Sequence, residues 1–203
     1  MMIITEIVTL DQRRSRVSVD GSFAFVLYKR EIKKYDIELE KEISRECYDE
    51  ILSDVIIHRA KARILYLLKA SDRTEKQLYD KLKEGYYPKE AIEVAIAYAK
   101  SYHYIDDERY ARNYIQFHGK KNSKKQLMYT LLQKGIGKEL LENLLEENPV
   151  DEDIQIQKWL TKKHYNSENA TYEEKQKLGA ALVRKGFSVD NIKQRLGNSS
   201  IYD

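Results

Sequence analysis

The segment 123-SKKQLMYTLLQKGIGKELLENLL-145 decides the fold of this chain. Ser123 and Gln126 form a capping box, in which the Ser hydroxyl accepts a backbone N–H and the Gln side chain reaches back to the cap. The apolar residues that follow fall on one helical face: Leu127, Leu131 and Leu132. The segment therefore begins with a short capped helix.

The second half of this segment predicts a turn and another helix. Gly135 suits a helix end at positive φ, and a new helix is expected from about Gly137. Its apolar positions are Leu140, Leu141, Leu144 and Leu145.

The same order of cap, apolar face, Gly stop and second apolar face occurs twice more. Upstream the residues are Thr74 and Gln77, Leu78 and Leu82, Gly85, then Ile92 and Ile96, with Pro88 suited to the first turn of the second helix. Downstream they are Thr171 and Glu174, Leu178 and Leu182, Gly186, then Ile192 and Leu196. The chain is therefore built from three copies of one helical unit.

Each copy also has a leading helix, so the unit is expected to contain three helices. The first follows Ser44 as one long helix or as two helices with a break near Ser53, and the second starts at Asp106 or Asp107. The third starts after Asp151, with an apolar side of Ile154, Ile156, Trp159 and Leu160, and residues 166–171 read as an exposed loop. The predicted repeats are 44–104, 105–149 and 150–203, stacked into an elongated curved rod.

Residues 1–43 predict a β-hairpin extension and a connector. Residues 3–8 favour a short strand, and Val17 and Val19 alternate up to Asp20-Gly21, which favours a tight hairpin turn. Phe23, Phe25 and Leu27 alternate away from that turn. An isolated hairpin is barely stable, so this sheet either packs on the helices or is mobile.

Composition sets limits on location and class. The 203 residues carry a formal net charge of only +3, and the single Cys47 cannot form an intrachain disulfide, which favours a reducing cytoplasm. Residues 1–10 lack a signal-peptide pattern, and no apolar run approaches the length of a membrane span. A cytoplasmic protein without membrane contact, and a monomer, is expected.

Charge is concentrated in residues 109–138, which contain eight Lys or Arg and no Asp or Glu. A solvated Lys face is the plain interpretation, but such faces usually include Glu for i,i+4 pairs, and this run has none. An anionic partner surface is the preferred hypothesis, and a helix N-terminus near Ser123 would add its positive end toward a phosphate. The candidate contact residues are Arg73, Arg109, Arg112, Lys120, Lys121, Lys124, Lys125 and Lys134.

No pattern for catalysis, metal binding or a cofactor is found. Asp106, Asp107 and Glu108 fit a helix start, the four His have no ligand spacing, and phosphate-loop and nucleophile motifs are missing. Most of the sixteen Tyr are interpreted as core positions, with Tyr129 and the set Tyr98, Tyr102 and Tyr104 as exceptions to watch. The protein is expected to be no enzyme and to need no cofactor.

Several of these residues together resemble a known family. Arg73-Thr74-Glu75-x-Gln77-Leu78, then 104-YIDDERYA-111, then the Lys134-Gly135-Ile136 ending look like the signature of the RecX family. The N-terminal hairpin resembles an extension seen in members from Gram-positive lineages.

The resemblance implies a non-enzymatic regulator of the RecA recombinase, in homologous recombination, DNA repair and the SOS response. The family is built from three-helix repeats and binds RecA and its filament on single-stranded DNA, in the helical groove of the filament. The usual consequence is inhibition.

Two departures from the family pattern stand out. Members commonly carry Arg and Gly before the second helix of the middle repeat, whereas this chain has 119-GKKNSKK-125. Lys supplies charge without bidentate geometry, so contacts there should be less directional. Gly85 also lies one residue closer to Leu82 than its counterparts do, so the first turn should differ.

Two other functions stay open. In one, the basic second repeat binds DNA directly and competes with RecA for the strand. In the other, which ignores the resemblance, the chain is a helical-repeat adaptor for an unrelated acidic protein.

Overall fold

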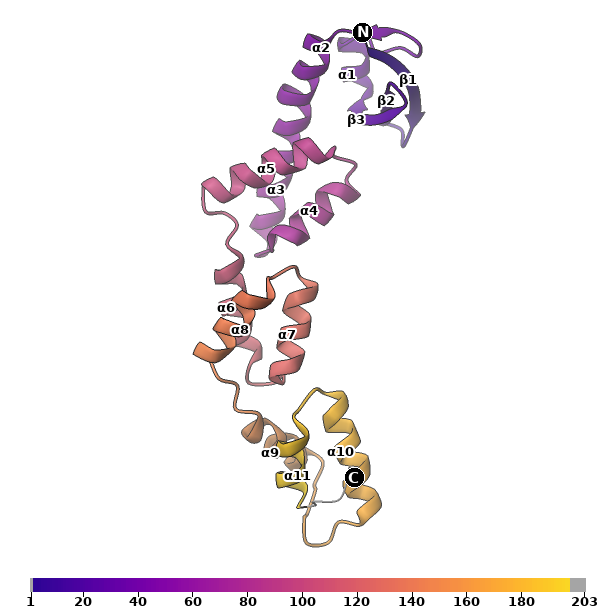
Figure 1. Ribbon diagram of the computed structural model, residues 1–203. Coiled ribbons are helices and arrows are strands. Elements are labelled where there is room, and N and C mark those ends of the chain that lie inside the picture. Colours follow the sequence, from indigo (N-terminus) through magenta and orange to yellow (C-terminus); the bar gives the residue numbers. More distant parts are fainter. Residues whose placement is uncertain (1, 198–203) are drawn as a thin grey trace. The chain divides into compact units, whose positions relative to one another are not determined.

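The computed structural model describes residues 2–197, which fall into two compact units divided between Asp106 and Asp107. The first unit combines an antiparallel sheet with helices, whereas the described part of the second unit is helical (Figure 1). The predicted class, three-helix repeats with a small N-terminal sheet, is confirmed. The curvature of the stack and the four sequence ranges assigned to its parts stay predictions.

The N-terminal sheet has the order β3-β2-β1-β4, from β1 (Met2–Thr9), β2 (Arg14–Val19), β3 (Ser22–Tyr28) and β4 (Glu42–Ile43). The predicted hairpin joins β2 to β3, and Asp20 and Gly21 both have positive φ, 48° and 76°. The two-residue β4 carries no alternating pattern, so the sequence did not predict it.

Two β-bulges adjust the register of this sheet. In β3, Val17 pairs with Phe25 and Ser18 with Phe23, so Ala24 is the extra residue of the strand. The bulge takes Phe23 off the face of Phe25, and Phe23 is 42% exposed while Phe25 is fully buried. The expectation that Phe23 continues the buried alternation was wrong for this reason.

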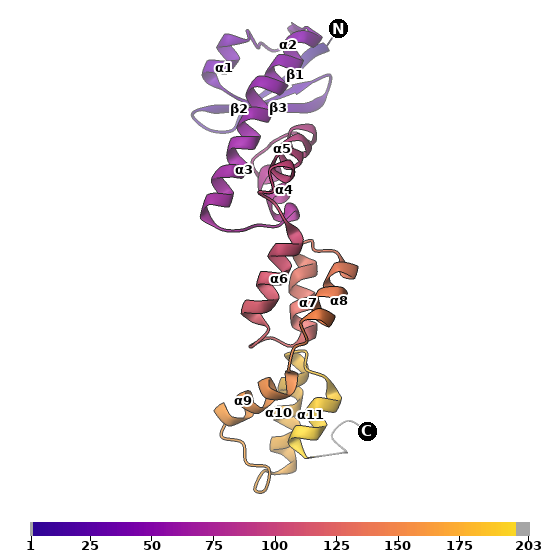
Figure 2. The ribbon, with the colours of Figure 1, turned by 90° about the vertical axis from the view of Figure 1, so that its left-hand side faces the viewer.

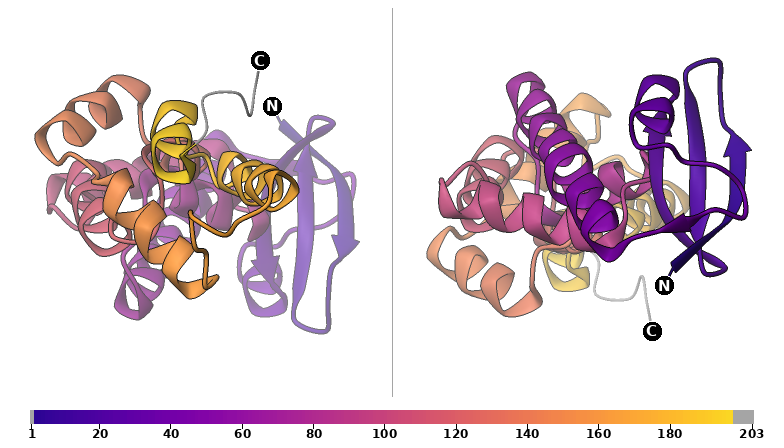
Figure 3. Two further views of the ribbon diagram at one scale, coloured as in Figure 1. Left: turned by 90° about the horizontal axis from the view of Figure 1, so that it is seen from below. Right: turned by 90° about the horizontal axis from the view of Figure 1, so that it is seen from above.

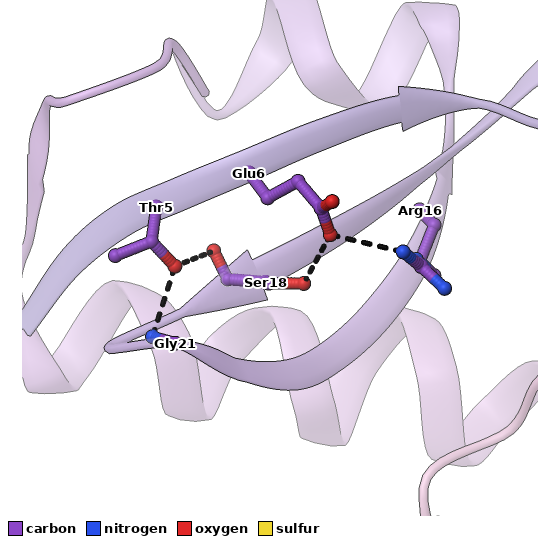
Figure 4. Close-up of polar contacts among 5 residues, drawn as sticks. All are labelled: Thr5, Glu6, Arg16, Ser18 and Gly21. Atoms are coloured by element: carbon purple, nitrogen blue, oxygen red, sulfur yellow. Dashed lines mark hydrogen bonds and ion pairs between the residues drawn. The ribbon is translucent and has the colours of Figure 1, made fainter.

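The second bulge lies in β1 and is held by polar contacts (Figure 4). The Thr5 hydroxyl accepts the Gly21 N–H at 2.9 Å and donates to the Ser18 carbonyl at 3.3 Å. The Glu6 carboxylate accepts hydrogen bonds from Ser18 Oγ at 3.1 Å and Arg16 Nη2 at 3.0 Å. These contacts tie the first strand to the hairpin.

A short helix, α1 (Lys29–Lys34), leads to a continuous helical stretch made of α2 (Arg45–Glu50), the π-helical segment η1 (Ile51–Ile57) and α3 (His58–Ala70). Ser44 caps it as predicted, accepting the Cys47 N–H at 3.1 Å. Of the two alternatives, the single long helix is correct, and Ser53 lies in its π-helical segment rather than at a break.

The sheet packs on this long helix (Figures 2 and 3), which answers the question left open by the sequence. Phe25 and Leu27 of the sheet, Ile56 and Ile64 of the long helix, and Leu78 further along belong to one buried cluster. The hairpin is therefore part of the core of the first unit.

The first repeat continues with α4 (Glu75–Glu84) and α5 (Lys89–Ser101). The predicted capping box is complete, because the Gln77 N–H donates to Thr74 Oγ1 at 3.2 Å and the Thr74 N–H donates to Gln77 Oε1 at 3.1 Å. Pro88 is the N-cap of α5. Gly85 has φ −80° and the next residue, Tyr86, takes φ +60°, so this turn differs as expected.

The second repeat consists of α6 (Asp107–His118), α7 (Lys124–Gln133) and α8 (Lys138–Glu147). Gly135 has φ +91° and Gly137 is the N-cap of α8, both as predicted. Its buried core is Ala111, Ile115, Leu127, Leu131, Ile136, Leu141, Leu144 and Leu145. Leu132 is 39% exposed, so its assignment to the apolar face was wrong, because the residues at i and i+4 already fill that face.

The third repeat consists of α9 (Glu152–Lys162), α10 (Tyr172–Arg184) and α11 (Val189–Leu196), and the predicted loop 166–171 joins α9 to α10. Ile156 and Leu160 are buried, but Ile154 is 49% exposed and does not belong to the apolar side. Arg195 Nε donates to Asp153 Oδ1 at 2.5 Å, which joins α11 to α9 and lowers the pKa of the Asp153 carboxyl.

Candidate partner-binding surface

Four of the predicted contact residues surround the start of α7: Lys120, Lys121, Lys124 and Lys125. The first two lie in the turn after α6, and the other two lie in the first turn of α7, because the Ser123 cap sets the start of that helix. All four side chains are exposed. Within residues 2–197, no carboxylate lies within 4.0 Å of their ammonium groups, so they form a cluster of solvated charge (lysine cluster).

Ser123 fixes this cluster to the third repeat. Its buried hydroxyl accepts the Gln126 N–H at 3.2 Å, which confirms the hydroxyl half of the predicted cap. The same hydroxyl donates to the carbonyl of Lys185 at 2.8 Å. One side chain therefore both starts α7 and binds the turn between α10 and α11.

The N-terminus of α7 is occupied by a carboxylate of the protein itself. Glu152 Oε1 accepts the Lys124 N–H at 2.8 Å, and Glu152 Oε2 accepts the Ser188 N–H at 3.2 Å. An acid between two helix starts compensates the positive end of both. The expectation that this N-terminus faces a phosphate is therefore corrected: the backbone N–H of Lys124 is already bonded to Glu152.

Arg112 lies in two ion pairs. Its Nη2 is 2.9 Å from Glu108 Oε1, one turn earlier on α6, and its Nη1 is 2.9 Å from Glu147 Oε2 on α8. The hydrogen bonds that the Arg112 guanidinium donates to Glu108, and then to Glu147, raise its pKa. The expectation that the basic run has no i,i+4 acid partners was wrong, because these acids lie just outside residues 109–138.

The remaining predicted contact residues have different surroundings. Lys134 ends α7, with its ammonium 5.7 Å from the ring centroids of Tyr110 and Tyr114. Arg109 is exposed on α6. Arg73 belongs to the first unit, where its Nε is buried without a hydrogen-bond partner among the described residues. A role of any of these residues in partner contact stays a prediction.

Fewer tyrosines belong to the core than the sequence suggested, because seven of the fifteen in residues 2–197 are exposed: Tyr28, Tyr66, Tyr86, Tyr102, Tyr104, Tyr129 and Tyr172. Tyr110 and Tyr114 pack against the core of the second repeat, with ring centroids 6.3 Å apart. Tyr129 is 65% exposed on α7, beside the lysine cluster. In the first unit, Tyr102 and Tyr104 are exposed and stack on each other at 5.9 Å.

Sequence reasoning missed three lysines of the third repeat. Lys158 and Lys162 of α9, and Lys185 after α10, line one cleft together with Lys120 and Lys121. No linear signal could have found them, because they lie 20 or more residues downstream of the basic run and acidic residues separate them from it.

No metal site emerges from the described part of the chain. Among residues 2–197, no group of three or more His, Cys, Asp or Glu side chains could hold a metal ion. In the same residues, no helix has both the length and the apolar character needed to cross a membrane.

The fold and the lysine cluster define a class, a helical-repeat protein with a basic surface. Two family models match this chain, described as "RecX, first three-helix domain" over residues 60–98 and "RecX, third three-helix domain" over residues 151–196. The chain is 33% identical over 198 residues to the "Regulatory protein RecX" of Caldanaerobacter subterraneus subsp. tengcongensis, covering 96% of this chain and 98% of that protein. This chain therefore belongs to the RecX family.

Further relatives agree. The "Regulatory protein RecX" of Clostridium perfringens (strain SM101) is 33% identical over 202 residues, which cover 92% of this chain and 91% of that protein. A crystal structure of "regulatory protein RecX" has a similar fold, with a TM-score of 0.64 at 24% identity over 97% of this chain and 99% of that one. RecX from Lactobacillus salivarius has a TM-score of 0.56 at 24% identity, covering 70% of this chain and 96% of that one.

Proposed function

We propose that this protein regulates the RecA recombinase without being an enzyme, by binding RecA and its filament on single-stranded DNA in the helical groove of the filament. The expected effect is inhibition of RecA, and through it of homologous recombination, DNA repair and the SOS response. Membership of a family of regulatory proteins supports a regulatory role, and RecA as the partner follows from the family resemblance. The half-buried free thiol of Cys47 fits a cytoplasmic protein, which we expect to act as a monomer.

The observation that carries the proposal is the lysine cluster. Lys120, Lys121, Lys124 and Lys125 are exposed, and no carboxylate of the described residues neutralises them within 4.0 Å. A helical lysine pairs with an acid where one lies a turn away, as Lys138 does with Glu142 at 3.4 Å. Four cations without such partners favour an anionic partner, which a filament of protein and DNA provides.

The test is the ATPase activity of RecA on single-stranded DNA, titrated with this protein at fixed salt. We expect loss of turnover at substoichiometric protein. The double variant Lys124→Glu/Lys125→Glu should need roughly tenfold more protein for the same effect, because it reverses two charges of the cluster. Its matched control is Lys175→Glu/Lys177→Glu, which reverses two charges on α10 and should behave as the wild type.

Two results would reject the proposal. One is an unchanged ATPase rate with excess folded wild-type protein, as judged by circular dichroism. The other is an equal effect of the α7 and α10 variants, which would show that net charge rather than the lysine cluster matters.

A second function, direct DNA binding that competes with RecA for the strand, is favoured by the same four lysines. If about four to six cations neutralise phosphates of a single strand, log K should fall with log salt at a slope of about −3 to −4. Inhibition that disappears when single-stranded DNA is in excess over RecA would support this function. Inhibition that is independent of the DNA-to-RecA ratio would support contact with RecA.

A further inference from the structure

We propose that a cleft between the second and third repeats, lined by five lysines, binds the phosphate backbone of single-stranded nucleic acid. The cleft has a volume of about 720 Å³, and its lysines are Lys120, Lys121, Lys158, Lys162 and Lys185. No acidic residue of the described chain lines it. The proposal deepens the proposed DNA contact, on which it rests, by extending it into the third repeat.

The charge of this cleft is not neutralised locally. Lys158 and Lys162 are one turn apart on α9, a spacing at which like charges disfavour the helix. Neither of them, nor Lys185, lies within 4.0 Å of a carboxylate of the described residues. An anionic ligand stabilises a concentration of positive charge, so the cleft should bind a polyanion more tightly than a neutral ligand.

An adjoining cleft of about 680 Å³ between the same two repeats has a different lining, so an excess of lysines without acids is not a general feature of the contact between these repeats. It shares Lys120 and Lys158 but is also lined by Arg112, Glu147 and Asp151. Its two acids offset two of its three cations, and Glu147 is paired with Arg112. The two clefts contain parts of the same repeats, and only the five-lysine cleft lacks acids.

The two sides of the cleft are held together by hydrogen bonds between the repeats. The Ser123 hydroxyl holds the Lys185 carbonyl at 2.8 Å, and the Gln155 amide donates to the Gly119 carbonyl at 2.5 Å. These bonds fix the turn that carries Lys120 against α9 and the α10–α11 turn. The lysines therefore converge before any ligand binds, which reduces the entropy cost of binding.

The other lining groups favour a nucleic acid strand over an acidic protein segment. The half-buried Trp159 adds aromatic surface among the lysines, the combination on which bases of a single strand stack. The Oε1 atom of Gln155, a residue only 7% exposed, accepts no hydrogen bond from the described residues, and nucleobases carry N–H donors that could satisfy it. Lys gives non-directional charge, which suits a backbone of repeating phosphates.

The test uses the purified full-length chain without RecA and a fluorescently labelled thymidine oligonucleotide, with anisotropy measured over a range of KCl concentrations. Five neutralised phosphates should give a slope of log K against log salt of about −3.5. The variant Lys158→Gln/Lys162→Gln should reduce the slope to about −2 and weaken binding at about 0.1 M salt by roughly tenfold or more. The matched control Lys175→Gln/Lys177→Gln removes the same charge from α10 and should keep the wild-type slope.

A second readout locates the bound strand. Trp159 is the only tryptophan of the chain, so its emission reports on this cleft alone. The oligonucleotide should change that emission in the wild type and in the α10 control, and added salt should reverse the change. The Lys158→Gln/Lys162→Gln variant should lose most of the response at the same oligonucleotide concentration.

Three results would overturn the assignment: a wild type that does not bind the oligonucleotide, equal binding by both double variants, or binding without any change in Trp159 emission. A Lys158→Gln/Lys162→Gln variant that binds DNA normally but no longer inhibits RecA would assign the cleft to protein contact instead. RecA is absent from the anisotropy assay, so a negative result there would not contradict the proposed regulation of RecA. A negative result in the ATPase titration would likewise not contradict the proposal that the cleft binds single-stranded nucleic acid.

Discussion

The two compact units are stabilised in different ways. In the first unit, one buried cluster runs from the sheet through the long helix to α4 and α5. In the second unit, the second and third repeats have separate small clusters, centred on Leu131 and Ile156 respectively. Polar contacts join the two repeats, namely the hydrogen bonds from Ser123 to Lys185 and from Gln155 to Gly119.

This difference has an energetic consequence. A buried apolar side chain contributes about 1.5–3 kcal/mol, whereas a hydrogen bond contributes a net of only about 0.5–1.5 kcal/mol. The repeats of the second unit are therefore joined less strongly than the sheet and helices of the first.

The largest expected effect comes from emptying a core of the second unit. Leu131→Ala should lower the free energy of unfolding of that unit by about 2–5 kcal/mol, because the side chain is fully buried and the small cluster cannot refill the cavity. Urea unfolding followed by circular dichroism should then show an earlier transition for the second unit and an unshifted one for the first.

The neighbouring residue provides the matched control. Leu132→Ala removes the same atoms from a side chain that is 39% exposed and should cost less than about 1 kcal/mol. A single transition that shifts as a whole in the Leu131→Ala variant would contradict the view that the two units have independent cores.

A smaller effect is expected at the polar junction. Gly186 has φ +80°, and a Cβ added there would lie 2.8 Å from Ser123 Oγ. Gly186→Ala should therefore cost about 2–3 kcal/mol, of which about 1–2 is backbone strain and about 1 is the disturbed Ser123–Lys185 hydrogen bond. Thermal unfolding measures the loss.

Gly137→Ala is the control for this change, because Gly137 has φ −64° and a Cβ added there meets no atom within 4 Å. Its cost should stay below about 1 kcal/mol, because Ala caps a helix less well than Gly but has less freedom to lose on folding. Equal stability of the Gly186→Ala and Gly137→Ala variants would mean that the junction adapts freely and that the close approach of Gly186 to Ser123 carries no energy.

The sequence predicted most of what is local in this fold. Caps at Ser44, Thr74 and Ser123 and the turn at Asp20-Gly21 depend on neighbouring residues only, so the chain itself encodes them. The bulge at Ala24 escaped prediction because it depends on how β3 pairs with β2.

The candidate site was predicted only in part, for the same reason. Lys120 and Lys124 stand out in the linear sequence because acids are missing around them. Their surroundings come from distant residues: Glu152 binds the start of α7, and Lys158 and Lys185 complete the cleft. The uneven distribution of charge along the chain therefore predicts the lysines that the second repeat contributes to the cleft, but not those that the third repeat contributes.

The smallest expected effect tests the first unit and has the opposite sign. The turns at Gly135 and Gly186 place a glycine at positive φ, whereas the equivalent residue of the first repeat is Tyr86, at φ +60°. A non-glycine residue is strained there by about 1 kcal/mol, and Tyr86 is 49% exposed, so few contacts offset the strain. Glycine's greater freedom in the unfolded chain offsets about 0.5–1 kcal/mol of this relief. Tyr86→Gly should therefore raise the free energy of unfolding of the first unit by only about 0–0.5 kcal/mol in urea titration.

Tyr102→Gly is the matched control for Tyr86→Gly, since Tyr102 also follows a helix and is 59% exposed but has φ −97°. This variant should lose at least about 0.5–1 kcal/mol, because glycine gains freedom in the unfolded chain, relieves no strain and removes the stacking of Tyr102 on Tyr104. Opposite signs for the two variants would show that the first repeat tolerates a strained turn because its core is larger. Equal losses of stability in the two variants would show that contacts of the Tyr86 ring stabilise the turn. The larger core of the first unit would then not be needed to explain a tyrosine at positive φ.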